Sequence, residues 1–488
     1  MTTEPAGKAA ARPGDVGRAA WLAFATLCLG DMMIVLDSTI VNVALPSVRT
    51  QLGFDEAGLS WVVNAFLLTF GGFLLLGGRL ADLYGQRRLF IYGVIGFTIA
   101  SLACGLAPTR EVLIVARAAQ GVVGAVVGAV ALALIMQLFP DGPARVRAMG
   151  YFGFISAGGG SVGVLLGGLI VGLLDWRWVF LINLPVGLAV WALALKLLPP
   201  DRAPETRPRL DVVGAALVTA AIMLAVYGIV GGEQVGWASP VTWGFIAAGV
   251  VLLGAFLAWE TKTREPLMPL DVFASRNVAT ANVVAVLWAA AMFAWFFLSA
   301  LYLQLVLGYT PMQVGLAFLP GNLIMGAFSY KLSAITVTRF GIRWPMVTGL
   351  LLAAAGLGLF ALAPVEGDFW IHVLPPMLLL GLGAGLAFNP VLLAAMNDVE
   401  PDRAGLASGV VNTAFMMGGA LGLAILASLA ASVTGDLNAA GAETRASLNG
   451  GYRIAFMAGA VCAALAALIG GVFIRPKPQG EGAPDLAH

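Results

Sequence analysis

The stretch GRLADLYGQRR, residues 78–88, is a short charged turn between two long apolar runs. Its glycines permit a tight turn, and its carboxylate lies close to two arginines. It is either an ordinary loop whose arginines face an anionic membrane surface, or a charge latch that holds the adjoining helices in one of two arrangements, as a gate requires. The residues of this predicted gating loop are Gly78, Asp82, Gly85, Arg87 and Arg88.

On both sides of this turn the chain is strongly apolar. Of its 488 residues, 60% are hydrophobic and 11% are charged, whereas about a quarter are charged in soluble globular proteins. The apolar runs have the length of about 20 residues that a helix needs to cross a bilayer, and they lack the alternation of barrel strands. The sequence therefore predicts an all-α integral membrane protein. Its fourteen predicted spans lie near residues 20–44, 59–77, 89–107, 112–138, 148–172, 178–198, 211–231, 240–259, 277–303, 312–334, 345–363, 371–396, 405–431 and 453–474.

The basic residues predict the orientation and the organisation of these spans. With both termini in the cytoplasm, 21 Lys and Arg lie inside, five lie outside and one lies within a span, which is the bias that the positive-inside rule requires. The expected location is therefore a cytoplasmic (inner) membrane. Polar connections after the sixth and eighth spans divide the chain into a tail, a six-helix bundle, a linker region with two inserted spans, a second six-helix bundle and a tail, at residues 1–18, 19–199, 200–275, 276–474 and 475–488.

Several motifs carry a family resemblance. The gating loop resembles the loop signature of the major facilitator superfamily, and TRFGIRW at residues 338–344 repeats part of it in the second half. Four further stretches resemble the 14-helix drug:proton antiporter family, in its quaternary ammonium compound and multidrug exporter branch. They are LDSTIVNVALP at residues 36–46, RAAQGVVGA at residues 117–125, WRWVFLINLPVG at residues 176–187 and GLASGVVNTAFMMGGALG at residues 405–422.

The resemblance implies a fold and a function. The expected fold has 14 transmembrane helices arranged as 6+2+6, with two pseudo-repeated six-helix bundles. The expected function is proton-coupled antiport that exports hydrophobic or amphiphilic small molecules, such as drugs, antibiotics or toxic compounds. A proton-coupled uptake symporter or facilitator of the same fold is the alternative, because Val164 takes the place of the proline in the antiporter signature of the fifth span. Gln86 also departs from the family pattern, since it replaces a basic residue of the loop.

Three charged residues lie well inside the predicted spans. Asp31 and Asp37 lie in the first span and Arg117 lies in the fourth. An Asp at the centre of a membrane helix costs about 2.5 to 3.5 kcal/mol, so a function is expected for it. Arg117 either snorkels to the membrane surface, or faces a polar cavity and meets one of the two acids.

Proton transfer is the predicted role of these acids. Removal from water disfavours the charged form of a carboxyl group, so that such a group can bind and release a proton at cellular pH. The family resemblance implies that Asp37 and Arg117 are the proton-coupling residues, with Asp31 as a second acid or a contact for a cation. The alternative is that the acids only hold helices together by hydrogen bonds. Asp31 shares one helix face with Ser38 and Asn42, and Asp37 lies beside that face.

Two further sets of residues complete the predicted sites. In the fifth span Gly159, Gly163 and Gly167 recur every four residues, and Gly168 follows them. They predict close helix packing or a seam that resists proton leak. A substrate cavity is predicted from Ser38, Asn42, Gln120, Asn282, Trp288, Trp295, Gln304, Asn322, Asn389 and Asn412, and helix packing is the alternative for the last seven.

Composition also indicates what the protein does without. Three cysteines without CxxC spacing and two histidines predict neither a disulfide framework nor a metal site, and a net charge of +1 gives no indication of a nucleic-acid partner. No catalytic triad or phosphate loop is present in the sequence. We therefore expect a non-enzymatic transporter without a cofactor, driven by the proton gradient. Its expected partners are a drug-like small molecule, protons and the lipid bilayer, and it is expected to work as a monomer.

Overall fold

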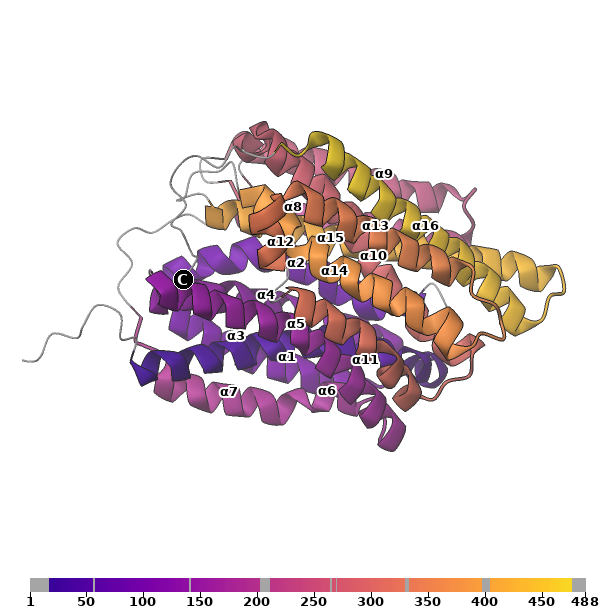
Figure 1. Cartoon of the computed structure of the whole chain (residues 1–488), viewed down its shortest axis with the longest axis horizontal. Helices are drawn as coiled ribbons and strands as arrows, with labels where there is room; N and C mark the ends of the chain where they lie inside the picture. The colour runs from indigo at the N-terminus through magenta and orange to yellow at the C-terminus, as the bar shows by residue number, and fades with distance from the viewer. Residues whose placement is uncertain are drawn as a thin grey trace, which may run out of the picture.

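A computed structural model describes residues 17–55, 58–139, 142–201, 211–263, 266–268, 270–329, 333–396 and 404–475. Within these ranges the regular structure is helical, and the helices lie side by side along one common direction (Figure 1). Eleven helical stretches in the described part are long and apolar enough to cross a membrane. The prediction of an all-α, multi-pass membrane protein is thus confirmed, whereas eleven such stretches do not establish the fourteen crossings.

Helices α1 to α7 form a first group. In this group α2 packs along α4, and α1 packs along α5 and α7. The predicted span at residues 178–198 is two helices, because Pro185 cannot donate to the carbonyl of Leu181 and its ring crowds that group. The helices are α1 (Arg18–Leu52), α2 (Trp61–Tyr84), α3 (Gln86–Gly105), α4 (Arg110–Leu138), α5 (Gly142–Leu173), α6 (Trp178–Leu181) and α7 (Asn183–Leu197).

Helices α10 to α16 form a second group, in which α10 packs on α15 and α16 and α13 packs on α14. For the helix predicted at residues 312–334, α11 extends to Ala327, residues 328 and 329 continue it as a π-helical turn, and residues 330–332 lie outside the described part. Two π-helical turns, Tyr302–Val306 and Phe369–Val373, adjoin α10 and α14. The α-helices are α10 (Arg276–Leu301), α11 (Pro311–Ala327), α12 (Ser333–Phe340), α13 (Arg343–Ala361), α14 (Leu374–Met396), α15 (Ala404–Ala439) and α16 (Thr444–Phe473).

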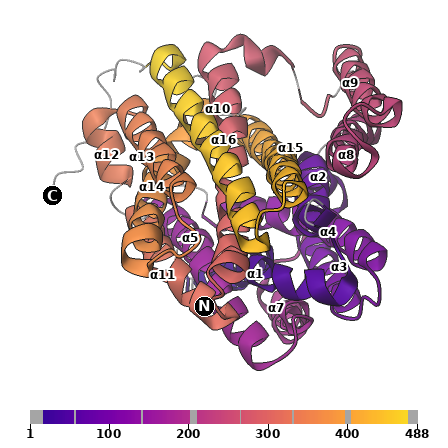
Figure 2. The same cartoon turned by 90° about the vertical axis from the view of Figure 1, so that its right-hand side faces the viewer.

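Helices α8 (Val212–Val235) and α9 (Pro240–Glu260) form a hairpin between the two groups in sequence. Helix α8 packs on α2 and α15, and α9 packs mainly on α8. In Figure 2 the hairpin lies at the edge of the molecule, beside α2. The hairpin therefore packs on the outside of the two groups and does not separate them.

The two groups meet along α2 and α15 and along α5 and α11, and two of their contacts lie at the end of the bundles that is remote from Arg18. There the Gln304 side chain donates to the backbone carbonyl of Val43 at 3.1 Å. Helices α5 and α11 also approach so closely that a methyl group on Gly168 would lie 2.6 Å from the carbonyl oxygen of Pro311. This end of the interface is consequently closed.

Corresponding turns of the two groups share one backbone feature. Gly85 between α2 and α3 has φ +94°, and Gly341 between α12 and α13 has φ +73°. Both values lie in the left-handed region that glycine adopts without a steric penalty. The repeat seen between GRLADLYGQRR and TRFGIRW therefore includes a positive φ at the matching glycine.

Candidate functional site

A buried ion pair joins α1 to α4. The Arg117 guanidinium donates through Nη1 to Oδ2 of Asp37, and both side chains are 0% exposed. Each residue interrupts an apolar helix and could not be kept charged in lipid without a partner. The pair therefore accounts for both charges at once.

Polar side chains from α4 and from one further helix, α7, complete the coordination of Asp37. Its Oδ1 accepts hydrogen bonds from Gln120 Nε2 at 2.8 Å and from Asn183 Nδ2 at 2.9 Å. Both donors also contact the hydroxyl of Ser101, at 2.8 and 3.3 Å. The network thus connects α1, α3, α4 and α7, and its carboxylate accepts three hydrogen bonds.

The guanidinium group of Arg117 has a mixed environment. Its Nε donates to the carbonyl oxygen of Val62 in α2 at 2.8 Å, and Nη1 also contacts Gln120 Oε1 at 2.7 Å. The rings of Phe66 and Phe180 lie 4.5 and 5.6 Å from its central carbon, within range of cation–π attraction. Its Nη2 is buried and has no hydrogen-bond partner among the described residues. The charge is therefore held mainly by Asp37.

The predictions for these residues have different outcomes. Arg117 meets an acid and does not snorkel, and the acid is Asp37. The expectation that the pair borders a polar cavity is wrong, because the first group of helices covers both side chains completely. Gln120, a predicted cavity residue, belongs to this network, whereas Asp31 is partly exposed elsewhere on α1.

Sequence analysis missed Asn183 and Ser101. Asn183 is the only polar side chain between Phe180 and Trp191, and it lies within the quoted motif at residues 176–187. A single polar residue in an apolar helix was the available signal. Ser101 carried no comparable signal, since a hydroxyl can bond to its own helix backbone.

The predicted gating loop docks on a residue that was not predicted. The backbone N–H groups of Arg87 and Arg88 donate to the Asp201 carboxylate at 2.7 and 3.3 Å, and the Arg87 side chain donates to the Leu195 carbonyl at 2.6 Å. Asp201 therefore caps the first turn of α3, where a negative charge is favourable. The side chain of Asp82 lies outside the described residues, and Gly78 has open space beside its Cα.

The predicted glycine seam has two faces. A methyl group on Gly159, Gly163 or Gly167 would contact α1, at 3.1, 2.1 and 2.9 Å respectively. Gly168 instead faces α11. Val164 is 1% exposed, and α5 continues past it without a break, so that the missing proline leaves this helix continuous.

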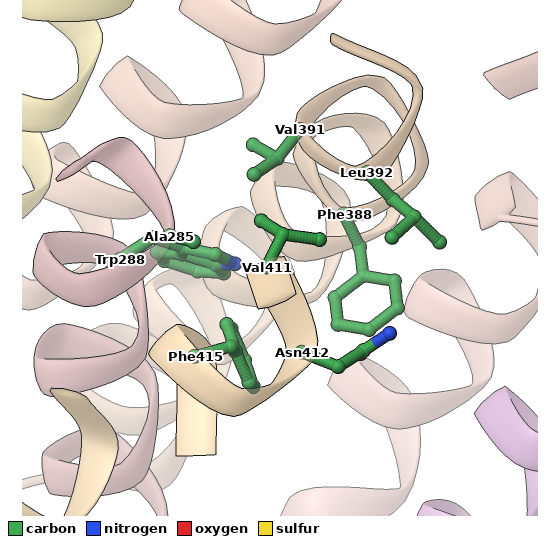
Figure 3. A pocket seen from close by; sticks show the side chains of 8 residues that line it. All are labelled: Ala285, Trp288, Phe388, Val391, Leu392, Val411, Asn412 and Phe415. Atoms are coloured by element: carbon green, nitrogen blue, oxygen red, sulfur yellow. The ribbon is translucent and has the colours of Figure 1, made fainter. Parts of the chain in front are cut away.

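The remaining cavity candidates make different contacts in the described part of the chain. Ser38 and Asn42 bond to carbonyls of their own helix, Asn389 donates to the Ser329 carbonyl at 3.0 Å, and Gln304 joins the two groups. Three further candidates have buried polar atoms without a hydrogen-bond partner among the described residues. They are the amide of Asn322, the indole N–H of Trp295 and the side-chain oxygen of Asn282. Trp288 and Asn412 do line a common pocket, between α10, α14 and α15 (Figure 3).

Comparisons with known proteins show what the chain is similar to. The profile described as Major Facilitator Superfamily matches residues 27–423. The chain is 38% identical over 487 residues to the puromycin resistance protein of Streptomyces alboniger, covering 98% of this chain and 96% of that one. It is 34% identical over 440 residues to the tetracenomycin C resistance and export protein of Streptomyces glaucescens, covering 89% and 80%. An inward-facing bacterial homologue of the lysosomal transporter Spinster shares the fold, with a TM-score of 0.66 and 17% identity over 94% and 97% of the two chains.

Proposed function

Because the chain belongs to the major facilitator superfamily, we propose that it exports hydrophobic or amphiphilic small molecules across the cytoplasmic membrane in exchange for protons. Two relatives are named for resistance to puromycin and for export of tetracenomycin C, which supports export of drug-like compounds in preference to uptake. The proposal includes fourteen crossings in a 6+2+6 arrangement, cytoplasmic termini and bundles at residues 19–199 and 276–474. The proton gradient is its energy source, and no cofactor is required.

The observation that carries this proposal is the buried pair of Asp37 and Arg117. A proton that binds to Asp37 neutralises the carboxylate and leaves Arg117 as a buried charge without a counter-ion. Loss of one partner of a buried pair costs about 3 to 5 kcal/mol, which the helices can avoid only by rearranging. Since Asp37 joins α1 to α4 and α7, its protonation state sets how firmly the first bundle is held together.

The contacts between the bundles are the part of the structure that we expect to change when Asp37 is protonated. Gln304 and the α5–α11 contact close the end that is remote from Arg18, and α1 and α5 belong to both the closure and the bundle that contains Asp37. We propose that protonation from the outer side accompanies opening of this end, and that release of the proton to the cytoplasm accompanies its closure. One proton that crosses 100 mV supplies about 2.3 kcal/mol, enough for a roughly fiftyfold gradient of an uncharged substrate.

Substitution of the acid tests the proposal. In everted vesicles that contain the Asp37→Asn variant, we expect proton-driven uptake of tetracenomycin C to be lost, because Asn cannot exchange a proton. Asp175→Asn, which alters a carboxylate in the loop between α5 and α6, is the matched control and should retain export. Wild-type rates in the Asp37→Asn vesicles would contradict the assignment of the coupling acid.

Asp31 has a separate proposed role, as a second acid or a contact for a cation. It is partly exposed on α1, so the Asp31→Asn variant should lower export of a cationic dye more than export of an uncharged one. Equal losses for the two dyes would exclude the cation contact. A decrease in substrate accumulation when a protonophore is added to intact cells would indicate uptake in place of export.

A further inference from the structure

The α8–α9 hairpin packs across the contact between the two groups of helices. A methyl group on Gly72 of α2 would lie 2.0 Å from the hydroxyl oxygen of Thr219 in α8 and 3.3 Å from the terminal carbon of Met417 in α15. Further along α8, the Ser428 hydroxyl of α15 donates to the carbonyl oxygen of Ile229 at 3.4 Å. Helix α8 therefore contacts one helix of each group, and Figure 2 shows it beside both.

A short segment after α9 packs against the same place. We call residues 266–268 the strap. Leu267 and Met268 of the strap pack in an apolar cluster that is separate from the main core and draws on both groups and the hairpin. Because packed side chains resist gradual deformation, α2 and α15 cannot move far apart while the strap and hairpin stay docked on both. The other buried members of the cluster are Leu76 of α2, Ala215 and Val218 of α8, Phe256 of α9 and Met417 of α15.

Two buried carboxyl groups hold the strap by its backbone. The N–H of Met268 donates to Glu260 Oε2 at 2.7 Å, and the N–H of Leu267 donates to Asp211 Oδ2 at 3.4 Å. Glu260 is 3% exposed and Asp211 is 6% exposed. Asp211 precedes α8 and Glu260 ends α9, so the strap is attached to both helices of the hairpin.

The two carboxyl groups also contact each other, and this contact requires a proton. They lie within hydrogen-bond distance, and a methyl group on Gly214 would lie 2.4 Å from Asp211 Oδ2 and 2.6 Å from Glu260 Oε1. This Oε1 is buried and has no donor among the described residues. Two ionised carboxylates offer acceptors only, whereas a protonated Glu260 donates to the Asp211 carboxylate. When two carboxyl groups share a site, one of them keeps its proton to a higher pH than an isolated carboxyl group does.

The described part of the chain provides no counter-ion for either acid. None of the ion pairs found there includes Asp211 or Glu260, and Lys262, Asp271 and Arg276 on the adjoining elements are exposed. A shared proton therefore replaces a counter-ion. The other charged residues of the elements around the pair are Asp436 near the far end of α15, and Arg79, Asp82, Glu233, Arg264 and Glu265, whose side chains lie outside the described residues.

We propose that Asp211 and Glu260 form a proton-operated clamp, which holds the strap across α2 and α15 while the two acids share one proton and releases it when that proton is lost. Docking is complete while the proton is bound and weakens as pH rises, because the ionised pair is buried without a donor between its members. In the proposed orientation this end of the hairpin faces the cytoplasm. The inference rests on the proposed export function and adds its regulation, since proton entry that acidifies the cytoplasm would close the clamp and slow the transport cycle.

Hydrogen–deuterium exchange of the Met268 N–H measures docking of the strap. The full-length protein in lipid nanodiscs is exchanged between about pH 6 and about pH 9, and the rate at Met268 is resolved by fragmentation of its peptide. Each rate is divided by that of the Glu260→Gln variant at the same pH, which cancels the intrinsic effect of pH on exchange. In this variant the amide donates to Asp211 without a titratable proton, so the strap should stay docked. The ratio of wild type to variant should therefore rise about tenfold with pH, as expected for loss of one charge-assisted hydrogen bond.

A second amide variant and a control make this test specific. Asp211→Asn also leaves a fixed hydrogen between the two side chains, so its exchange ratio to Glu260→Gln should not change with pH, and it serves as the reference if Glu260→Gln does not fold. Glu366→Gln removes an exposed carboxylate between α13 and α14 and should behave as the wild type. A wild-type ratio that stays constant over this pH range would overturn the clamp.

A second measurement tests whether the strap restrains the two groups. In a chain without native cysteines, Met312→Cys places a thiol at the contact of α5 with α11. Its reactivity toward a soluble maleimide, divided by that of the same chain with Glu260→Gln, should rise with pH as the strap is released. A constant reactivity ratio together with pH-dependent exchange at Met268 would overturn the restraint.

The outcomes separate the clamp from the transport function, because neither measurement requires transport. A chain that shows both pH dependences and exports neither puromycin nor tetracenomycin C would overturn the proposed function alone. Normal export by a chain whose strap exchanges independently of pH, relative to Glu260→Gln, would overturn the clamp alone.

Discussion

At the scale of single residues, the ion pair of Asp37 and Arg117 determines how the first bundle tolerates substitution. Arg117→Met removes one charge and leaves the other buried, which should destabilise the protein by about 3 to 5 kcal/mol. The double variant Asp37→Asn with Arg117→Met leaves no unpaired charge and should recover most of that loss. Thermal unfolding in detergent measures the stability of the two single variants and of the double variant relative to the wild type. If the double variant is as unstable as the sum of the single variants, the two residues do not act as a pair.

How far these residues could be predicted depends on their chemistry. A guanidinium group in an apolar helix needs an acid, and with two acids inside spans the sequence left few choices for Arg117. Asn183 and Asp201 were missed, because their partners Asp37 and Arg87 lie 146 and 114 positions away in the chain. Such neutral or backbone hydrogen bonds have no charge requirement that identifies the partner before the helices are packed.

At the scale of helices, Asp211 holds the base of the α8–α9 hairpin. Burial opposes its ionisation, but hydrogen bonds from the backbone N–H of Gly214 and the indole of Trp259, both at 2.8 Å, keep the pKa of Asp211 below its ordinary value. A lowered pKa in the folded state contributes stability above the unfolded pKa of about 3.9, and this contribution disappears as pH falls through the folded value.

Because the pKa of Asp211 is lowered in the folded state, the effect of Asp211→Ala on stability should depend on pH. At pH 6 to 8 the variant should unfold at a lower temperature than the wild type, with a loss of about 1 to 2 kcal/mol for a helix N-cap. Below pH 4 the two melting temperatures should converge. A constant difference between pH 3 and pH 8 would show that the ionised carboxylate has no special contribution.

The glycines of α5 give a second prediction for helices. Gly168→Ala would place a methyl group 2.6 Å from the Pro311 carbonyl, whereas Gly172→Ala would make ordinary contacts of 3.9 Å with Met312. The first substitution should push α5 from α11 and favour the form open at this end, so that the thiol of Met312→Cys, at the same contact, becomes more reactive toward a soluble maleimide. The second is the matched control. Equal reactivity in both variants would mean that this contact does not close the interface.

The periodicity of α5 explains what the sequence could predict about this contact. Residues four apart lie on one helix face, and Gly159, Gly163 and Gly167 all face α1. Gly168 is about 100° further around the helix and therefore faces α11. Periodicity gives the face, but the identity of the neighbouring helix depends on how the two bundles meet.

At the scale of the whole molecule, the arrangement of crossings was predicted from hydropathy and charge, and its helical nature is confirmed. The number of crossings depends on segments near the threshold length. Helix α11, with 17 residues, is shorter than the roughly 20 residues of an average span, and composition alone does not decide such a case. The α8–α9 hairpin is the part that distinguishes fourteen crossings from twelve.

Single cysteines on the hairpin test this arrangement directly. If α8 and α9 each cross the membrane, their connecting turn lies outside and the end of α9 lies inside, because the termini are expected in the cytoplasm. In a variant without the native cysteines, Ala238→Cys should react with a membrane-impermeant maleimide in intact cells. Lys262→Cys should react only in everted vesicles; both positions are exposed in the structure. Reaction of both cysteines from the same side would show that the hairpin lies on the surface, and the 6+2+6 arrangement would then be wrong.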